Sequence, residues 1–177
     1  MRSNNRIIYT IGHSTRTMKE FLNMLINYGV KELVDVRTIP RSRHNPQFNE
    51  AMLRYRLKKA AITYKRIKEL GGLRHSLKNS VNIGWKNKSF RGYADYMQTA
   101  GFESGLKKLK KIAGKKITAI MCAEALPWRC HRSLIADALT KNKWEIFHIM
   151  SPKNFYKHKI TSFARTKKGK IIYPAIS

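Results

Sequence analysis

The sequence predicts a single α/β domain built on a mostly parallel sheet of about five strands, with helices on both faces. Short apolar runs rich in β-branched residues alternate along the chain with segments whose apolar residues recur at helical spacing. Strands that alternate with helices are usually parallel, because each helix carries the chain back across the sheet. With 177 residues and 42% hydrophobic content, the chain is long and apolar enough for one buried core. It contains no internal repeat and no Gly/Ser-rich linker that would divide it.

The first half of the chain alternates three predicted strands with two predicted helices. Thr17 and Glu20 have the spacing of a capping box, which places the start of the first helix. The strands are expected at residues 6–11, 31–37 and 62–64, and the helices at 17–28 and 49–60. In the second strand, alternation places Leu33, Asp35 and Arg37 on one face and Val34 and Val36 on the other.

The second half begins with a long basic loop and ends with a basic segment. After a turn at residues 70–73, the loop covers residues 74–88, and it is followed by two helices, a buried strand, a loop with Pro127, another helix and a last strand. The helices are expected at 90–99, 103–111 and 130–139, and the strands at 117–122 and 144–150. Residues 1–150 therefore form the α/β domain. The basic segment 151–177 either docks on that domain or becomes ordered only on a partner.

The charge balance is the most unusual feature of the composition. The chain has 37 Lys and Arg against 10 Asp and Glu, a net charge of +27. Such a surface attracts polyanions, which include nucleic acid, an acidic membrane surface and phosphorylated small molecules. The alternative is that many of the lysines only solvate helices. With no apolar run of membrane-spanning length, no secretory leader and only two cysteines, we expect a cytoplasmic protein with reduced thiols and no membrane partner.

Chemically active residues follow several of the predicted strands. His13 and Ser14 come after the first strand, Asp35 ends the second, Glu124 follows the fourth and His148 lies near the end of the last. Ligands of parallel α/β sheets bind outside the carboxyl ends of the strands. The sequence therefore predicts one site at that edge of the sheet.

The loop after the fourth strand is the densest cluster of such residues. It carries Cys122, Glu124, Trp128, Arg129, Cys130, His131 and Arg132. Cys130 precedes a helix, where the helix dipole and neighbouring cations lower a thiol pKa, so it is a candidate nucleophile with His131. The alternatives are two small buried residues or a redox-sensitive cysteine pair. The Cys-x5-Arg loop of phosphatases is absent, since Trp128 and Ala136 stand at the arginine positions. Zinc is disfavoured by the Cys-x7-Cys-His spacing and the adjacent arginines, so no metal is expected.

Four motifs in order resemble the domain-of-unknown-function 488 family. They are Tyr9-Thr-Ile-Gly-His-Ser14; Val34-Asp-Val-Arg37 with Pro40 and Ser42; Leu70-Gly-Gly72; and Met121-Cys-Ala-Glu124 with Cys130-His-Arg132. The resemblance covers about residues 7–148. It implies a shared fold and shared motifs, and it implies no reaction.

Asp35 and Glu124 are candidates for general acid and base, because burial and nearby arginines can separate two carboxyl pKa values. The alternative, weighed equally, is that Asp35 pairs with Arg37 or Arg132 and organises the loop. Those arginines, with Arg129, are candidates to hold phosphate. His13 is a candidate proton carrier.

Further candidates for substrate binding lie in the loops. Ser14 either contributes a hydrogen bond to phosphate or caps a helix. Trp85 and Trp128 lie in predicted loops and are candidates to stack on bases. Tyr93 and Tyr96, at helical spacing, are more typical of a core.

We therefore expect a hydrolase or lyase that acts on a nucleic acid or a nucleotide, with DNA or RNA or a phosphorylated ligand as partner. No cofactor is expected, because Gly71-Gly72 lacks the context of dinucleotide-binding and P-loop motifs. The alternatives are a non-catalytic nucleic-acid-binding module and an enzyme for a small anionic substrate. The sequence contains no indication of an oligomeric state.

Overall fold

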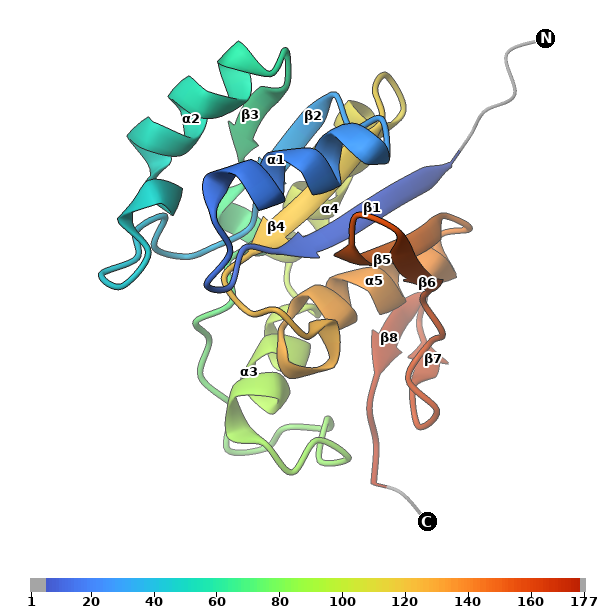
Figure 1. The fold of residues 1–177 in the computed structure, drawn as a ribbon. Coiled ribbons are helices and arrows are strands. Elements are labelled where there is room, and N and C mark those ends of the chain that lie inside the picture. The colour runs from blue at the N-terminus through green and yellow to red at the C-terminus, as the bar shows by residue number, and fades with distance from the viewer. Residues whose placement is uncertain (1–5, 176–177) are drawn as a thin grey trace, which may run out of the picture.

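A computed structural model describes residues 6–175, and its centre is a six-stranded sheet with the strand order β3-β2-β4-β1-β5-β6 (Figure 1). All neighbouring strands are parallel except β5 and β6, which are antiparallel. The strands are β1 (Ile7–Gly12), β2 (Glu32–Asp35), β3 (Thr63–Arg66), β4 (Thr118–Cys122), β5 (Glu145–Ser151) and β6 (Asn154–Lys157). A separate two-stranded sheet consists of β7 (Arg165–Lys167) and β8 (Lys170–Ile172).

The helices follow the strands much as the sequence predicts. They are α1 (Met18–Asn27), α2 (Glu50–Lys59), α3 (Lys88–Tyr96), α4 (Ala100–Ala113) and α5 (Arg132–Lys141). Short 3-10 turns cover Pro46–Phe48, Lys68–Leu70 and Pro127–Arg129. The capping box is confirmed, because Thr17 accepts from the Glu20 amide while the Glu20 carboxylate accepts from Thr17. Residues 1–5, where we expected no secretory leader, lie outside the described residues.

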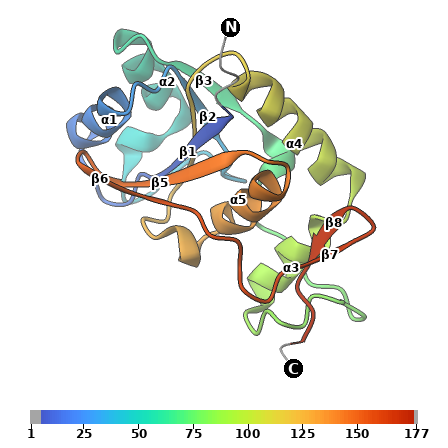
Figure 2. The same ribbon diagram turned by 90° about the vertical axis from the view of Figure 1, so that its right-hand side faces the viewer.

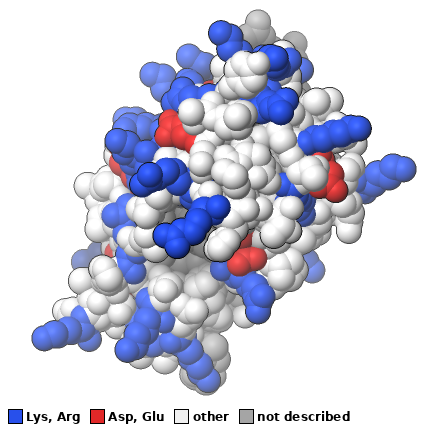
Figure 3. All heavy atoms as spheres, turned by 60° about the vertical axis from the view of Figure 1, so that its left-hand side comes forward, with Lys and Arg blue, Asp and Glu red and all other residues white. Residues whose placement is uncertain are grey.

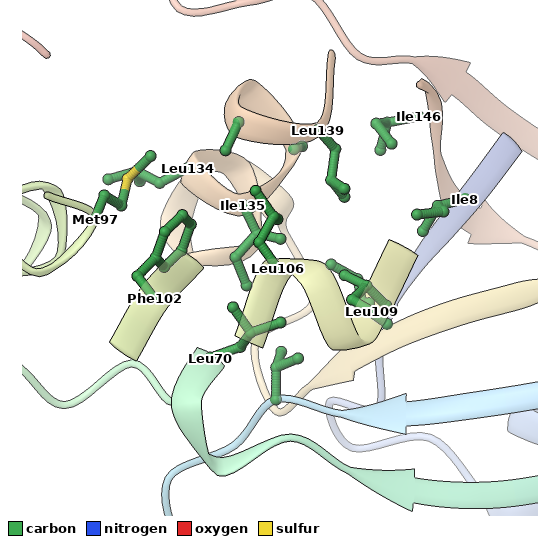
Figure 4. Close-up of a cluster of buried hydrophobic side chains, with 14 of the residues drawn as sticks. Ile8, Leu70, Met97, Phe102, Leu106, Leu109, Leu134, Ile135, Leu139 and Ile146 are labelled. Atoms are coloured by element: carbon green, nitrogen blue, oxygen red, sulfur yellow. The ribbon is translucent and has the colours of Figure 1, made fainter. Parts of the chain in front are cut away.

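Helices cover both faces of the sheet, so the α/β class is confirmed (Figure 2). The face formed by Leu33 and its neighbours packs on α1 and α2. Val34 and Val36 lie on the opposite face, against the core that α3, α4 and α5 complete. Figure 4 shows this second core, where Leu106 of α4 lies beside Ile135 of α5. The alternation predicted for the second strand therefore decides which helices each of its side chains meets.

The segment after residue 150 packs on the same domain. β6 extends the main sheet, which is why the sheet has six strands instead of about five. Ile171 and Tyr173 are buried, and the Tyr173 hydroxyl donates to Asp137 of α5 at 2.8 Å. Tertiary contacts of this kind order short strands that have no apolar alternation of their own.

The carboxyl ends of the central strands lie level with one another. Gly12 of β1 pairs with Cys122 of β4, and Asp35 of β2 pairs with Met121. The helix after β2 covers one face of the sheet and the helix after β4 covers the other, so the two connecting loops diverge. A crevice forms where neighbouring loops diverge in this way, and such a crevice is the usual ligand site of the fold.

Basic side chains are spread over the surface that Figure 3 shows, with few acidic side chains between them. This distribution produces a broad positive field. No helix in residues 6–175 has both the length and the apolar character to cross a lipid bilayer.

Candidate functional site

A cavity of about 360 Å³ opens between the diverging loops, at the carboxyl ends of β2 and β4. Its floor is formed by Cys122, Cys130 and His131. Apolar and glycine residues from the 71–93 region form one wall, and exposed charged side chains form the rim. The wall residues include Gly72, Leu73, Phe90 and Tyr93, and the rim residues include Arg41, Glu124 and Arg129. Arg37 also lines the cavity but is only 5% exposed. The volume lies within the range of small-molecule sites in proteins.

The two cysteine sulfurs lie 2.8 Å apart on the floor, and both thiols are free. Cys122 is the last residue of β4, and Cys130 precedes the first turn of α5. The Arg132 guanidinium donates to the Cys122 sulfur at 2.9 Å, and the Arg132 amide donates to the Cys130 sulfur at 3.5 Å. Each sulfur therefore accepts one hydrogen bond from Arg132, and an accepted hydrogen bond by itself favours the ionised form of a thiol.

His131 orients its ring between the cysteine and the backbone of β2. Its Nε2 lies 3.0 Å from the Val36 carbonyl, which can only accept, so Nε2 carries a proton. Nδ1 faces the Cys130 sulfur at 3.5 Å, where it takes the thiol proton or, once protonated, donates to the thiolate. Gly72 leaves the space that this ring occupies, since a Cβ there would lie 2.5 Å from Nδ1. The arrangement is that of a nucleophile, a base and a group that orients the base.

The two thiols have opposite acidities. Burial alone would raise the pKa of Cys130, but the hydrogen bond with Cys122 and the charges of His131 and Arg132 lower it well below the ordinary thiol value. Burial and the hydrogen bond with Cys130 raise the pKa of Cys122. The surroundings of Cys130 therefore favour a thiolate more than those of Cys122 do.

Arg132 points into the protein instead of towards the cavity. It is 1% exposed, and its remaining N–H groups donate to Thr10 and to the carbonyl of Glu124. Gly12 permits this close approach of the loop, because a Cβ there would lie 1.9 Å from the Glu124 carbonyl oxygen. Arg132, which we predicted to bind phosphate, instead holds the loop and the Cys122 sulfur.

A buried chain of hydrogen bonds continues from Thr10. The Thr10 hydroxyl meets His148 at 2.7 Å, His148 meets His158 at 2.9 Å, and His158 meets Asp137 at 2.7 Å. The Asp137 carboxylate only accepts, so His158 donates to it through Nε2. Burial, with the charges of His158 and Arg132, lowers the pKa of His148 to about 3, so this ring is neutral at pH 7.

Asp35 lies beneath the cavity and is fully buried. Its oxygens accept from the Arg37 guanidinium at 2.6 Å and from the Tyr64 hydroxyl at 2.8 Å. Arg37 lines the cavity, but its N–H groups donate to Asp35, to the Phe48 carbonyl and to His13. These contacts favour the interpretation in which Asp35 organises the loop.

His13 is held as a neutral ring. Arg37 donates to its Nε2 at 3.4 Å, so Nδ1 carries the proton and donates to the Ser14 carbonyl at 2.9 Å. Burial lowers the pKa of His13 to about 4, against its hydrogen bond to Ser14, and Phe48 stacks on the ring. Both ring nitrogens are thus occupied inside the protein.

The other predicted residues fall into two groups. Glu124 and Arg129 are exposed on the cavity rim. Ser14 is half-buried, outside the cavity lining, and its amide donates to Ala123. Trp128 is 57% exposed and lies against Tyr156, and Trp85 packs behind Phe90, with ring centroids 4.9 Å apart. Most of the predicted residues in the loop after β4 therefore line the cavity, whereas neither tryptophan does.

Sequence reasoning missed several residues of the site. Arg41 belongs to the basic loop after β2, and its polar surroundings alone gave no reason to choose it. Thr10 lies inside a buried strand, where a single threonine is typical of packing. By contrast, Phe90 and Tyr93 belong to a stretch of interleaved aromatic and basic residues, which is typical of a base-stacking surface as well as of a core, and both line the cavity. Among residues 6–175, no group of three His, Cys, Asp or Glu side chains is placed to hold a metal ion.

Comparison with known proteins gives one match. A family model described as "Domain of unknown function DUF488" matches residues 17–139, which contain most of the site. No curated protein and no solved structure matches the chain. Since the matched segment covers more than half of the 177 residues, the chain belongs to the DUF488 family.

Proposed function

We propose that the protein is a hydrolase or lyase that acts on a nucleotide or a nucleic acid, with Cys130 as its nucleophile. The observation that carries the proposal is the Cys130 sulfur, which lines a cavity of about 360 Å³ and receives the Arg132 amide while facing His131. A thiolate with this support is a far stronger nucleophile than an ordinary buried thiol.

The residues around the cavity have complementary roles. The thiolate attacks an electrophilic carbon or phosphorus of the substrate and displaces a leaving group, which takes its proton from the His131 imidazolium. Neutral His131 or the Glu124 carboxylate then removes a proton from water, and the hydroxide releases the product and the thiolate. In a lyase, Glu124 removes the substrate proton and no water is consumed.

Charge and shape support an anionic, ring-containing substrate. Arg41 and Arg129 are exposed at the rim, free of the internal contacts that occupy Arg37 and Arg132. Phe90, which is half-buried on the wall, offers aromatic surface, as base-binding sites do. The enclosed volume suits one nucleotide or one extruded base, and the net charge of +27 attracts a polyanion.

The test compares turnover with binding across a set of substrates. The purified chain is incubated with mononucleotides, single-stranded and duplex DNA, and RNA, and products are separated by chromatography. Cys130→Ser and Glu124→Gln are tested beside the wild type, and binding is followed by fluorescence anisotropy at several salt concentrations. Loss of turnover in Cys130→Ser of at least about 1,000-fold, with binding retained, is the expected result.

Other outcomes decide between the alternatives. Salt-sensitive binding with no turnover of any substrate indicates a non-catalytic nucleic-acid-binding module. Turnover of mononucleotides without binding to polymers indicates an enzyme for small anions. Undiminished turnover in Cys130→Ser contradicts the proposed nucleophile.

A further inference from the structure

The cysteine pair has a second chemical capacity. We infer that Cys122 and Cys130 form a redox-active dithiol, which a hydroperoxide converts into a disulfide and a thiol reductant restores. Cys130 is the residue attacked first, and Cys122 is the resolving residue. The oxidation is independent of the proposed function, and only its consequence for catalysis rests on that proposal.

The positions of the two sulfurs support disulfide formation. The sulfurs lie 2.8 Å apart, so a bond of about 2.05 Å requires them to approach by less than about 1 Å. Both sulfurs line the cavity, through which a small oxidant reaches them. In addition, residues 123–129 form a connecting loop with one short 3-10 turn, which can absorb such a shift more easily than a strand or a helix.

The surroundings assign different roles to the two sulfurs. Cys130 faces the His131 ring and accepts from the Arg132 amide in the first turn of α5, and these contacts favour its thiolate, the form that peroxides oxidise. Burial raises the pKa of Cys122, which makes it the less reactive thiol, and the hydrogen bond from Arg132 at 2.9 Å holds it beside Cys130. Redox-sensing cysteines have this combination of an ionised thiol and an adjacent resolving thiol.

Atoms and electrons balance in this oxidation with the hydroperoxide as the only other reactant. The Cys130 thiolate attacks a peroxide oxygen and breaks the O–O bond, which yields a sulfenic acid and, after protonation, water or an alcohol. The Cys122 thiol then attacks the Cys130 sulfur, its proton leaves with the hydroxide as water, and the S–S bond forms. The dithiol loses two electrons, and the peroxide gains them. The disulfide removes the nucleophile, so oxidation stops the proposed catalysis.

Intact-mass spectrometry tests the inference clearly, because the chain has only two cysteines. With one equivalent of hydrogen peroxide, the wild type is expected to lose the mass of two hydrogen atoms, and dithiothreitol is expected to restore it. Cys122→Ser is expected to gain one oxygen, which dimedone traps as a sulfenic acid adduct. Cys130→Ser, whose remaining Cys122 thiol is disfavoured as a thiolate by burial, is expected to react at least about tenfold more slowly.

Three results would overturn the inference. They are a wild type that gains two or three oxygens and no disulfide, a disulfide that links two chains on a non-reducing gel, and equal oxidation rates in the two variants. Because the measurement needs no substrate, its failure leaves the proposed hydrolase or lyase activity standing. Conversely, disulfide formation in a chain that turns over no nucleotide supports the dithiol and removes the proposed function.

Discussion

Asp35 and Glu124, the two candidate general acid and base residues, should differ in how much folding stability the protein loses when their charge is removed. Asp35→Asn should cost about 3–5 kcal/mol of folding free energy, because it leaves Arg37 buried without its counter-ion. Asp35 is 0% and Arg37 5% exposed, and the carboxylate accepts from the Arg37 amide, its guanidinium and Tyr64. The amide group of asparagine replaces one acceptor oxygen with donors that face other donors.

Urea unfolding followed by circular dichroism measures this effect. A loss of 4 kcal/mol with a slope of about 2 kcal/mol per M lowers the midpoint by about 2 M. Glu124→Gln is the matched control, because Glu124 also follows a central strand but is exposed, so its unfolding free energy should change by less than about 0.5 kcal/mol. Asp35→Asn should therefore lose activity because the protein unfolds more easily. Glu124→Gln should lose activity because it lacks the carboxylate proposed to remove a proton.

A double-mutant cycle separates the ion pair from other effects. Removing both charges in Asp35→Asn with Arg37→Gln leaves no unpaired buried ion, so the two changes should compensate by about 2 kcal/mol or more. Unfolding of Asp35→Asn within 0.5 kcal/mol of the wild type would refute the reasoning. The Asp35 carboxylate would then not be needed for folding stability and would be available for catalysis.

The remaining predictions concern the site and its supports. The folded-state pKa values of His13 and His148, about 4 and 3, lie below the unfolded value of 6.5, so the unfolded chain binds more protons and stability should fall as the pH drops below 6.5. Each histidine should lower the free energy of unfolding by roughly 2 kcal/mol between neutral pH and pH 5. The urea midpoint should therefore fall less steeply with decreasing pH in His148→Gln than in the wild type. An identical dependence on pH in both proteins would contradict this. Gly72→Ala should push the His131 ring from Cys130 and slow iodoacetamide labelling at pH 7 by about tenfold. Gly114→Ala, whose nearest contact is 3.3 Å away, should label like the wild type, and equal rates in both variants would show that His131 does not activate the thiol. Arg129→Gln should lower the salt slope of single-stranded DNA binding by about one unit. Lys107→Gln on the exposed side of α4 removes the same charge away from the cavity, and an equal slope change there would show that binding is not centred on the rim.

The local patterns of the sequence predicted the fold well because each depends on neighbouring residues. The capping box at Thr17 and the alternation of Leu33 and Val34 need no knowledge of distant contacts. The directions in which side chains point could not be predicted in this way. Arg132 follows Cys130 in the sequence as a phosphate ligand would, yet it turns inward because Thr10, from a distant strand, offers an acceptor. His131 is oriented by the Val36 carbonyl, a backbone group that leaves no trace in the sequence.

The hydrogen-bond chain explains why the basic carboxyl-terminal segment belongs to the site although it lines no part of the cavity. Asp137 accepts from His158, from the amide and hydroxyl of Thr161 and from Tyr173, so the segment supplies all of these donors. Asp137 fixes the direction of the bond from His158, and at the other end of the chain the Thr10 oxygen accepts from Arg132. Arg132 in turn holds the Cys122 sulfur. A change in the segment at His158 should therefore alter the reactivity of a cysteine pair with which it has no direct contact.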